Sequence, residues 1–326
     1  MQTNNPWIYI SAPENSLEFN TMRVEEVCNH NFWWIVDCVG KPGLGIEFNT
    51  EISLSYNVPS FSSFEIKLSK NNKFLLLFLI DLEVNTKFRV LCQDLINEAN
   101  SKTNIDGVEF LNHVMNTLKR WQRLFNVKKN NSPTLPQKLG LLGELNCLVN
   151  LIAKNVGFRS AVDAWQGPKG HEQDFLINGH LIEIKAQMAS LDRVVKINSL
   201  EQLDTTSGPI WLQHLGLSPI SVADSTSISI NMLIQRILDG LDGDNLGIDI
   251  FITLLELQGF QVQNDYGDEV FRTSFVKIYQ VREDFPKLTR KLIGSNAVVK
   301  ANYSINMSEL DPWIVDEEYI KARAFS

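Results

Sequence analysis

The pair Asn178-Gly179 lies in the middle of the segment HEQDFLINGHLIEIKAQ, which spans residues 171–187. Asn-Gly is the strongest short signal for a two-residue β-hairpin turn, because both positions of that turn require a positive φ. Hydrophobic residues alternate with polar residues on both sides of the pair, as in two strands that bury one face. The segment therefore predicts a hairpin whose register is fixed by its turn.

This register gathers charged side chains on one side of the hairpin. Counting outward from the turn sets Asp174 opposite Glu183, and directly opposed residues project from the same side of a sheet. Alternation adds Lys185 and Gln187 to that side. The other side is apolar and is expected to face the core; it carries Phe175, Ile177, Ile182, Ile184 and Ala186.

Two carboxylates held opposite each other repel unless something binds between them. A divalent cation can bind there, and hard oxygen ligands suit Mg²⁺ or Mn²⁺. We therefore interpret Asp174 and Glu183 as candidate metal ligands. The alternative is a solvated sheet face with ordinary ion pairs, such as one between Glu172 and Lys185.

The arrangement of Asp174, Glu183 and Lys185 resembles the active site of the PD-(D/E)xK nucleases, which have the restriction-endonuclease-like fold. The resemblance implies that both carboxylates hold the metal, helped by the backbone carbonyl of Ile184. It implies that Lys185 orients or activates the attacking water and stabilises charge on the phosphate. Gln187 matches the accessory glutamine of some members.

A helix is expected over residues 139–157, where apolar side chains recur at helical spacing and Gly157 is placed to end the helix. The segment GLLGEL of this helix carries Glu144. Nucleases of the superfamily commonly contribute a glutamate from the helix before the catalytic strands, so the resemblance makes Glu144 a third metal ligand or a water-positioning group. The alternative is a solvated helix carboxylate.

Further segments are similar to one family within the superfamily. DAWQGPKGHEQDF, GLLGEL, IEIKAQ and FPKLTRKL together look like a bacterial family of uncharacterised PD-(D/E)xK proteins, whose members tend to lie beside restriction and phage-defence genes. The likeness covers most of the chain and is firmest over residues 139–187. One departure is Gln173, because a proline often precedes the aspartate. The resemblance implies a Mg²⁺-dependent endonuclease that hydrolyses phosphodiester bonds in DNA.

The chain is expected to have three parts. Residues 1–105 contain short β-branched or aromatic runs separated by turn-rich pieces such as GKPGLG, and they predict a β-rich lobe for substrate or partner binding. Residues 106–138 predict a helix and a linker. Residues 139–326 predict an α/β domain, a restriction-endonuclease-like mixed sheet flanked by helices. The runs expected as strands in the first part are residues 32–39, 51–58, 63–69 and 74–80.

Composition limits the function classes. With 44% hydrophobic and 21% charged residues, the chain of 326 residues has the composition of a globular protein. Its net charge of −8 argues against broad, nonspecific coating of nucleic acid but permits a local basic groove. No Walker-type Gly-rich loop is present, which argues against ATP hydrolysis. No apolar run is long enough to span a bilayer and no signal peptide is evident, so we expect a cytoplasmic protein without a membrane partner.

Several alternatives remain open from the sequence. DNA is the expected partner; other subunits of a restriction or defence system and a second copy of the chain are further candidates. A nuclease-fold subunit that binds DNA or assembles a defence complex without cutting is the main alternative function, and a hydrolase of a small phosphorylated substrate is another. Trp165 could stack on a base or pack under a turn. Two basic clusters could track a phosphate backbone: Lys119, Arg120, Arg123, Lys128 and Lys129, and Lys287, Arg290 and Lys291.

Overall fold

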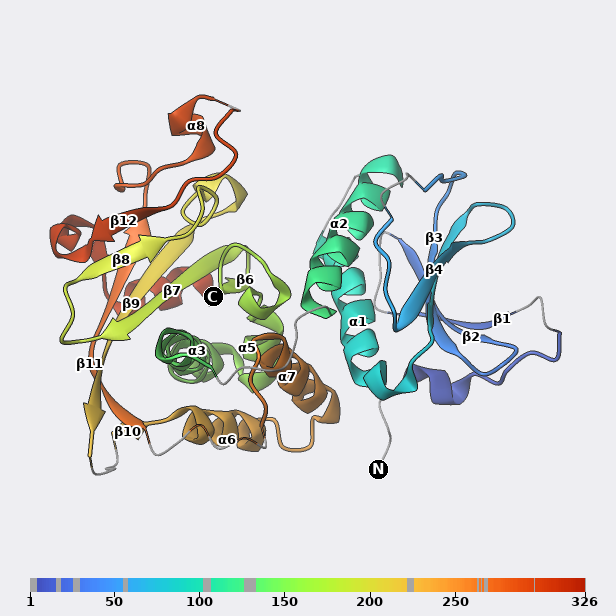
Figure 1. The fold of residues 1–326 in the computed structure, drawn as a ribbon, viewed down its shortest axis with the longest axis horizontal. Helices are drawn as coiled ribbons and strands as arrows, with labels where there is room; N and C mark the ends of the chain where they lie inside the picture. The colour runs from blue at the N-terminus through green and yellow to red at the C-terminus, as the bar shows by residue number, and fades with distance from the viewer. Residues whose placement is uncertain are drawn as a thin grey trace. The chain divides into compact units, whose positions relative to one another are not determined.

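The structure is a computed structural model of the chain. It describes residues 5–15, 19–25, 30–54, 58–101, 107–125, 133–221, 226–262, 264, 266, 269–295 and 297–325. The chain divides into two compact units, Met1–Lys128 and Lys129–Ser326, each with its own sheet (Figure 1).

The first unit contains an antiparallel sheet of five strands in the order β1-β2-β3-β5-β4. Two long helices pack on this sheet, where Phe64 of β4 contacts Phe88 of α1 at a ring-centroid distance of 5.3 Å. The unit's five strands all lie within residues 1–105, the range in which the sequence predicts a β-rich lobe. Its elements are η1 (Pro6–Tyr9), β1 (Phe19–Arg23), β2 (Asn31–Asp37), β3 (Pro42–Glu47), β4 (Phe64–Leu68), β5 (Phe74–Leu79), η2 (Leu82–Val84), α1 (Asn85–Ser101) and α2 (Gly107–Phe125).

Helix α2 belongs to this first unit, although the sequence grouped residues 106–138 as a separate helix and linker. Its Phe110 ring lies 5.5 Å from the ring of Phe48, measured between centroids. The helix therefore buries its apolar stripe on the lobe, and residues 126–132 of the expected linker lie outside the described residues. The buried stripe consists of Phe110, Val114, Leu118 and Trp121.

Strand β3 occupies a segment that the sequence marked as a turn. The Pro and Gly residues of GKPGLG predict a turn, yet Pro42–Glu47 is the central strand of the sheet. A Cβ at Gly43 would lie 2.4 Å from the carbonyl oxygen of Leu77, so glycine permits the close approach of β5. The strand expected at residues 51–58 is absent from the described residues 51–54 and 58, and residues 55–57 are not described.

The second unit is built on a six-stranded sheet in the order β10-β11-β9-β7-β6, with β13 paired to β11. Strands β7 and β9 are parallel and the other pairs are antiparallel, which makes the sheet mixed as predicted. A separate two-stranded sheet pairs β8 with β12. The strands are β6 (Phe175–Ile177), β7 (His180–Met188), β8 (Val194–Ile197), β9 (Ile210–Ile220), β10 (Ser227–Ile228), β11 (Val270–Val281), β12 (Tyr303–Asn306) and β13 (Ile314–Val315).

Helices cover one face of this sheet (Figure 1). The helix expected at residues 139–157 is present as α3, a π-helical segment η3 and α4, and Gly157 ends it with a φ of 82°. A Cβ at Gly143 would lie 2.6 Å from the Cβ of Ala186, so α3 lies directly against β7. The helical elements are α3 (Leu135–Cys147), η3 (Leu148–Ile152), α4 (Ala153–Val156), α5 (Phe158–Ala164), η4 (Gly167–Lys169), η5 (Thr205–Ser207), α6 (Ile230–Gly240), α7 (Asn245–Leu257), α8 (Arg290–Ile293), η6 (Met307–Glu309), η7 (Asp311–Trp313) and α9 (Glu317–Ala324).

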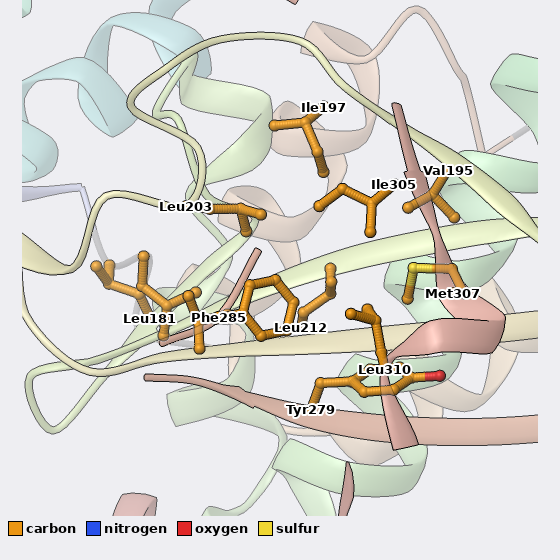
Figure 2. Close-up of a cluster of buried hydrophobic side chains, with 12 residues drawn as sticks. Leu181, Val195, Ile197, Leu203, Leu212, Tyr279, Phe285, Ile305, Met307 and Leu310 are labelled. Carbon is orange, nitrogen blue, oxygen red and sulfur yellow. The ribbon is translucent and has the colours of Figure 1, made fainter. Parts of the chain in front are cut away.

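The β8–β12 ribbon covers part of the opposite face of the sheet (Figure 2). Leu181 of β7, Leu212 of β9 and Tyr279 of β11 contribute to a buried cluster there with Val195 of β8 and Ile305 of β12. By strand alternation, Leu181 shares its side of β7 with Glu183. The hairpin side on which the sequence predicts the charged residues is therefore covered at one end by the ribbon, where the apolar Leu181 packs. None of the described helices combines the length and the apolar character needed to cross a lipid bilayer.

Candidate active site

The β6–β7 hairpin has the predicted turn and register. Asn178 and Gly179 have φ values of 48° and 77°. Phe175 pairs with Ile182, and Ile177 pairs with His180, as counting from the turn requires.

Asp174 precedes β6 at a point where the ladder becomes irregular. Its amide donates to the carbonyl oxygen of Ile182 at 3.1 Å, although Ile182 already pairs with Phe175. Its Oδ2 accepts a hydrogen bond from the amide of Ile184 at 2.7 Å. Counting outward from the turn pairs Asp174 with Glu183, but the structure does not pair them in the ladder. The carboxylate of Asp174 instead accepts the amide of Ile184.

Glu183 and Lys185 form an ion pair in the interior of the site. Glu183 is 1% exposed, and its Oε1 lies 2.7 Å from Lys185 Nζ. Its Oε2 is buried and accepts no hydrogen bond within the described part of the chain. Lys185 also donates to Gln202 Oε1 at 3.4 Å, a contact that no local sequence pattern indicates. Glu172 instead accepts a hydrogen bond from the Ser199 hydroxyl.

Glu144 reaches the site from α3. Its Oε2 accepts hydrogen bonds from Trp165 Nε1 at 2.7 Å and from Gln258 Nε2 at 3.1 Å. Trp165 is fully buried, so it packs under the turn and does not present its ring to a base. Gln258 lies 114 residues from Glu144, and periodicity and motifs carry no signal for such a contact.

Burial raises the pKa of all three carboxyl groups. It raises the pKa of Asp174 to about 6, although the Ile184 amide and Lys185 act in the opposite direction. The pKa values of Glu183 and Glu144 lie well above their usual range, first through burial and then through the charge of Asp174. The Lys185 ammonium lowers the pKa of each of the three. The four side chains therefore interact as one electrostatic group.

The donor set of this group fits a hard divalent cation. Carboxylate oxygens are the ligands that Mg²⁺ prefers, and Glu183 Oε2 is a buried oxygen without a partner in the described residues. A Cβ at Gly167 would lie 3.0 Å from Asp174 Oδ1 and 3.5 Å from Glu144 Oε2, so glycine leaves space beside both carboxylates.

The carboxylates do not yet converge on a single point. Across the described ranges, no three His, Cys, Asp or Glu side chains are gathered as ligands of one ion. Asp174 faces the Ile184 amide, Glu183 faces Lys185, and Glu144 faces its two donors. Lys185 occupies Oε1 of Glu183, so Oε2 is the Glu183 oxygen that an ion would contact. The role of the Ile184 carbonyl as a ligand stays a prediction.

The remaining predicted groups have other partners. Gln187 Nε2 donates to the carbonyl oxygen of Asp192 at 2.9 Å and so fastens the loop after β7. In the basic clusters, Arg120 forms ion pairs with acidic side chains of α1, and Arg290 pairs with Glu201. The side chains of Arg123, Lys128 and Lys129 lie outside the described residues.

A comparison with known families bears on this geometry. A family model described as "Putative PD-(D/E)XK family member, (DUF4420)" matches residues 3–308. The chain belongs to this family. The match confirms the resemblance drawn from the sequence, and the mixed sheet with its flanking helices agrees with a PD-(D/E)XK-like fold. No curated protein and no solved structure matches the chain.

Proposed function

We propose that this DUF4420 member is a Mg²⁺-dependent endonuclease that hydrolyses phosphodiester bonds in DNA. The observation that supports it best is the gathering of Glu144, Asp174 and Glu183 around Lys185, with one buried Glu183 oxygen that accepts no hydrogen bond from the residues that the structure describes. Uncompensated carboxylates in a protein interior are costly, and perturbed carboxyl groups of this kind mark functional sites.

The chain's own residues have separate tasks in this proposal. Asp174 and Glu183 hold the cation, and the Ile184 amide keeps the Asp174 carboxylate in one orientation. Lys185 places its ammonium beside the phosphate and the attacking water. Glu144 completes the ligand set or orients that water. A bound Mg²⁺ supplies neutralisation of phosphate charge and lowers the pKa of water. Mn²⁺ has the same ligand preferences and serves as a substitute.

The main alternative is a subunit with a nuclease fold that binds DNA or assembles a complex without cutting. The net charge of −8 and the internal pairing of Arg120 and Arg290 favour it, because they leave fewer cations for DNA. The proposed role in bacterial restriction or phage defence rests on the resemblance. The proposal of partner subunits rests on it too. Plating of phages on cells with wild-type or Lys185→Met protein tests that setting.

The nuclease proposal is tested by incubating the protein with supercoiled, linear, methylated and single-stranded DNA in Mg²⁺ or Mn²⁺. Lys185→Met keeps the length of the side chain but removes its charge, so we expect the cleavage rate to fall about 100-fold or more while metal is still bound. Lys196→Met, at an exposed position on β8, is the matched control and should cut like the wild type.

Two results would contradict the nuclease proposal. The first is a wild-type protein that binds DNA but cuts none of these substrates with either metal, which favours the assembly subunit. The second is cleavage that survives in Lys185→Met at the wild-type rate.

A further inference from the structure

Two neutral donors from distant parts of the second unit converge on one oxygen of Glu144. Trp165 follows the last residue of α5, and Gln258 follows the last residue of α7. Their side-chain nitrogens lie 2.7 Å and 3.1 Å from Glu144 Oε2. Hydrogen bonds to an ionised acceptor are stronger than those between neutral groups, so both contacts favour the carboxylate form.

These contacts leave the second oxygen of Glu144 available. Within the described part of the chain, Oε1 accepts no hydrogen bond. Trp165 is fully buried and packs against Phe251 with ring centroids 6.1 Å apart, so its N–H has a fixed direction. The carboxylate is thereby held by one oxygen, and the other is free for a ligand.

The turn at residues 165–167 connects Glu144 with Asp174. The amides of Gln166 and Gly167 donate to the carbonyl oxygen of Asp174 at 2.8 Å and 3.0 Å. Trp165 itself forms an isolated bridge with Phe175. One short turn therefore holds the side chain of the first carboxylate and the backbone of the second, so it fixes their relative placement.

We propose that Trp165 and Gln258 are positioning residues that hold Glu144 Oε2 and present Oε1 to the metal or to the attacking water. The inference rests on the proposed nuclease function and adds to it two residues outside the motif. A tryptophan kept only for packing does not need its N–H, because phenylalanine also fills an apolar pocket. The N–H of Trp165 points at a buried carboxylate, which indicates that it serves to orient that carboxylate.

The test is a double-mutant cycle of DNA cleavage. Trp165→Phe and Gln258→Met each remove one donor while keeping bulk, and each is made in the wild type and in Glu144→Gln. Outer-shell partners of ligands typically contribute 10- to 100-fold in activity or metal affinity. We expect each single change to lower kcat about 10-fold or more with an unchanged KM for DNA, and to weaken Mn²⁺ binding. In the Glu144→Gln background neither change should lower the rate further, because both residues act through that carboxylate.

Matched controls separate positioning from general damage. Trp211→Phe removes another buried N–H donor of this unit, which bonds His180 at 3.1 Å, and Gln235→Met replaces an exposed glutamine of α6. Both should keep kcat within about twofold, since neither contacts Glu144. If Trp165→Phe does not fold, Gln258→Met decides the question.

The possible failures are distinguishable. If the wild type cuts DNA but Trp165→Phe and Gln258→Met retain its kcat, this inference alone is wrong. An equally large loss in the Glu144→Gln background also overturns it and indicates a structural role. If the wild type cuts no DNA with either metal, the proposed function fails, and the inference fails with it.

Discussion

Asp174 combines a structural and a chemical task in one carboxyl group. Its Oδ2 accepts the Ile184 amide, so removal of the whole side chain leaves a buried donor without a partner. Its burial at the same time disfavours the ionised form and raises the pKa to about 6. A replacement that keeps an acceptor but cannot ionise separates the two tasks, and asparagine meets both conditions.

Asp174→Asn should therefore change the pH dependence of stability in a defined direction. The pKa of Asp174 in the folded state, about 6, lies above its ordinary value of 3.8. Its stabilising contribution is fully present below pH 3.8 and is lost as the pH rises through 6. Without metal, we expect the variant to be more stable than the wild type at pH 8 by on the order of 1–2 kcal/mol, with a smaller difference toward pH 4. Thermal unfolding across this pH range measures it.

Metal and a control variant make this measurement specific. Saturating Mg²⁺ should stabilise the wild type and not Asp174→Asn, because only the wild type offers both charges. Asp192→Asn, at an exposed position nearby, should show the pH profile of the wild type. A variant that is less stable than the wild type at pH 8 without metal would show that Asp174 is mainly a structural group.

Elements fixed by local signals were predictable, and those fixed by distant contacts were not. The Asn178-Gly179 turn set the register of the hairpin, and the helix ending at Gly157 followed from apolar spacing. Strand β3 was missed because its glycines serve a close approach by β5, which only the assembled sheet reveals. Asp174, Glu183 and Lys185 were predictable as candidate site residues because all three belong to one hairpin, whose pattern is local.

The partners of these groups come from other elements. Gln202 and Gln258 reach Lys185 and Glu144 from segments that no motif links to the hairpin. The β8–β12 ribbon covers part of one face of the sheet, and this contact likewise depends on tertiary packing (Figure 2). Local sequence patterns therefore identify the charged residues of the site. Their orientation and burial depend on tertiary contacts and could not be predicted from those patterns.

The contact between α3 and β7 is testable with two glycines of one helix. A Cβ at Gly143 would lie 2.6 Å from Ala186 Cβ and 3.0 Å from Ile184 Cγ2, whereas a Cβ at Gly140 has no atom within 4 Å. Gly143→Ala should push α3 from the strand that carries Glu183 and destabilise the fold by about 1–3 kcal/mol. Gly140→Ala is the matched control and should be neutral or stabilising by up to about 1 kcal/mol, because alanine favours a helix. Urea unfolding of both variants measures the difference, and equal stabilities would refute the close approach.

At the scale of the whole molecule, the candidate site belongs to one unit. Glu144, Asp174, Glu183 and Lys185 lie in the second unit, as do Trp165, Gln202 and Gln258, which bond to them. The first unit has its own sheet and its own buried side chains. The sequence predicts that the β-rich lobe binds DNA or a partner, and this stays a prediction.

Residues 129–326 expressed alone should therefore fold cooperatively and bind Mn²⁺ as the full chain does. Every proposed ligand and the residues that hold it are retained, and a unit of this size can bury a core of its own. We expect the Mn²⁺ affinity, measured by electron paramagnetic resonance, to agree with that of the full chain within about twofold, since the ligand set is unchanged. Asp174→Asn in the isolated unit should abolish this binding and so exclude adventitious sites. If DNA cleavage is lost while Mn²⁺ binding persists, the first unit supplies substrate contacts. If the isolated unit folds but binds no Mn²⁺ while the full chain does, the first unit contributes a ligand, and the assignment of the site to the second unit is wrong.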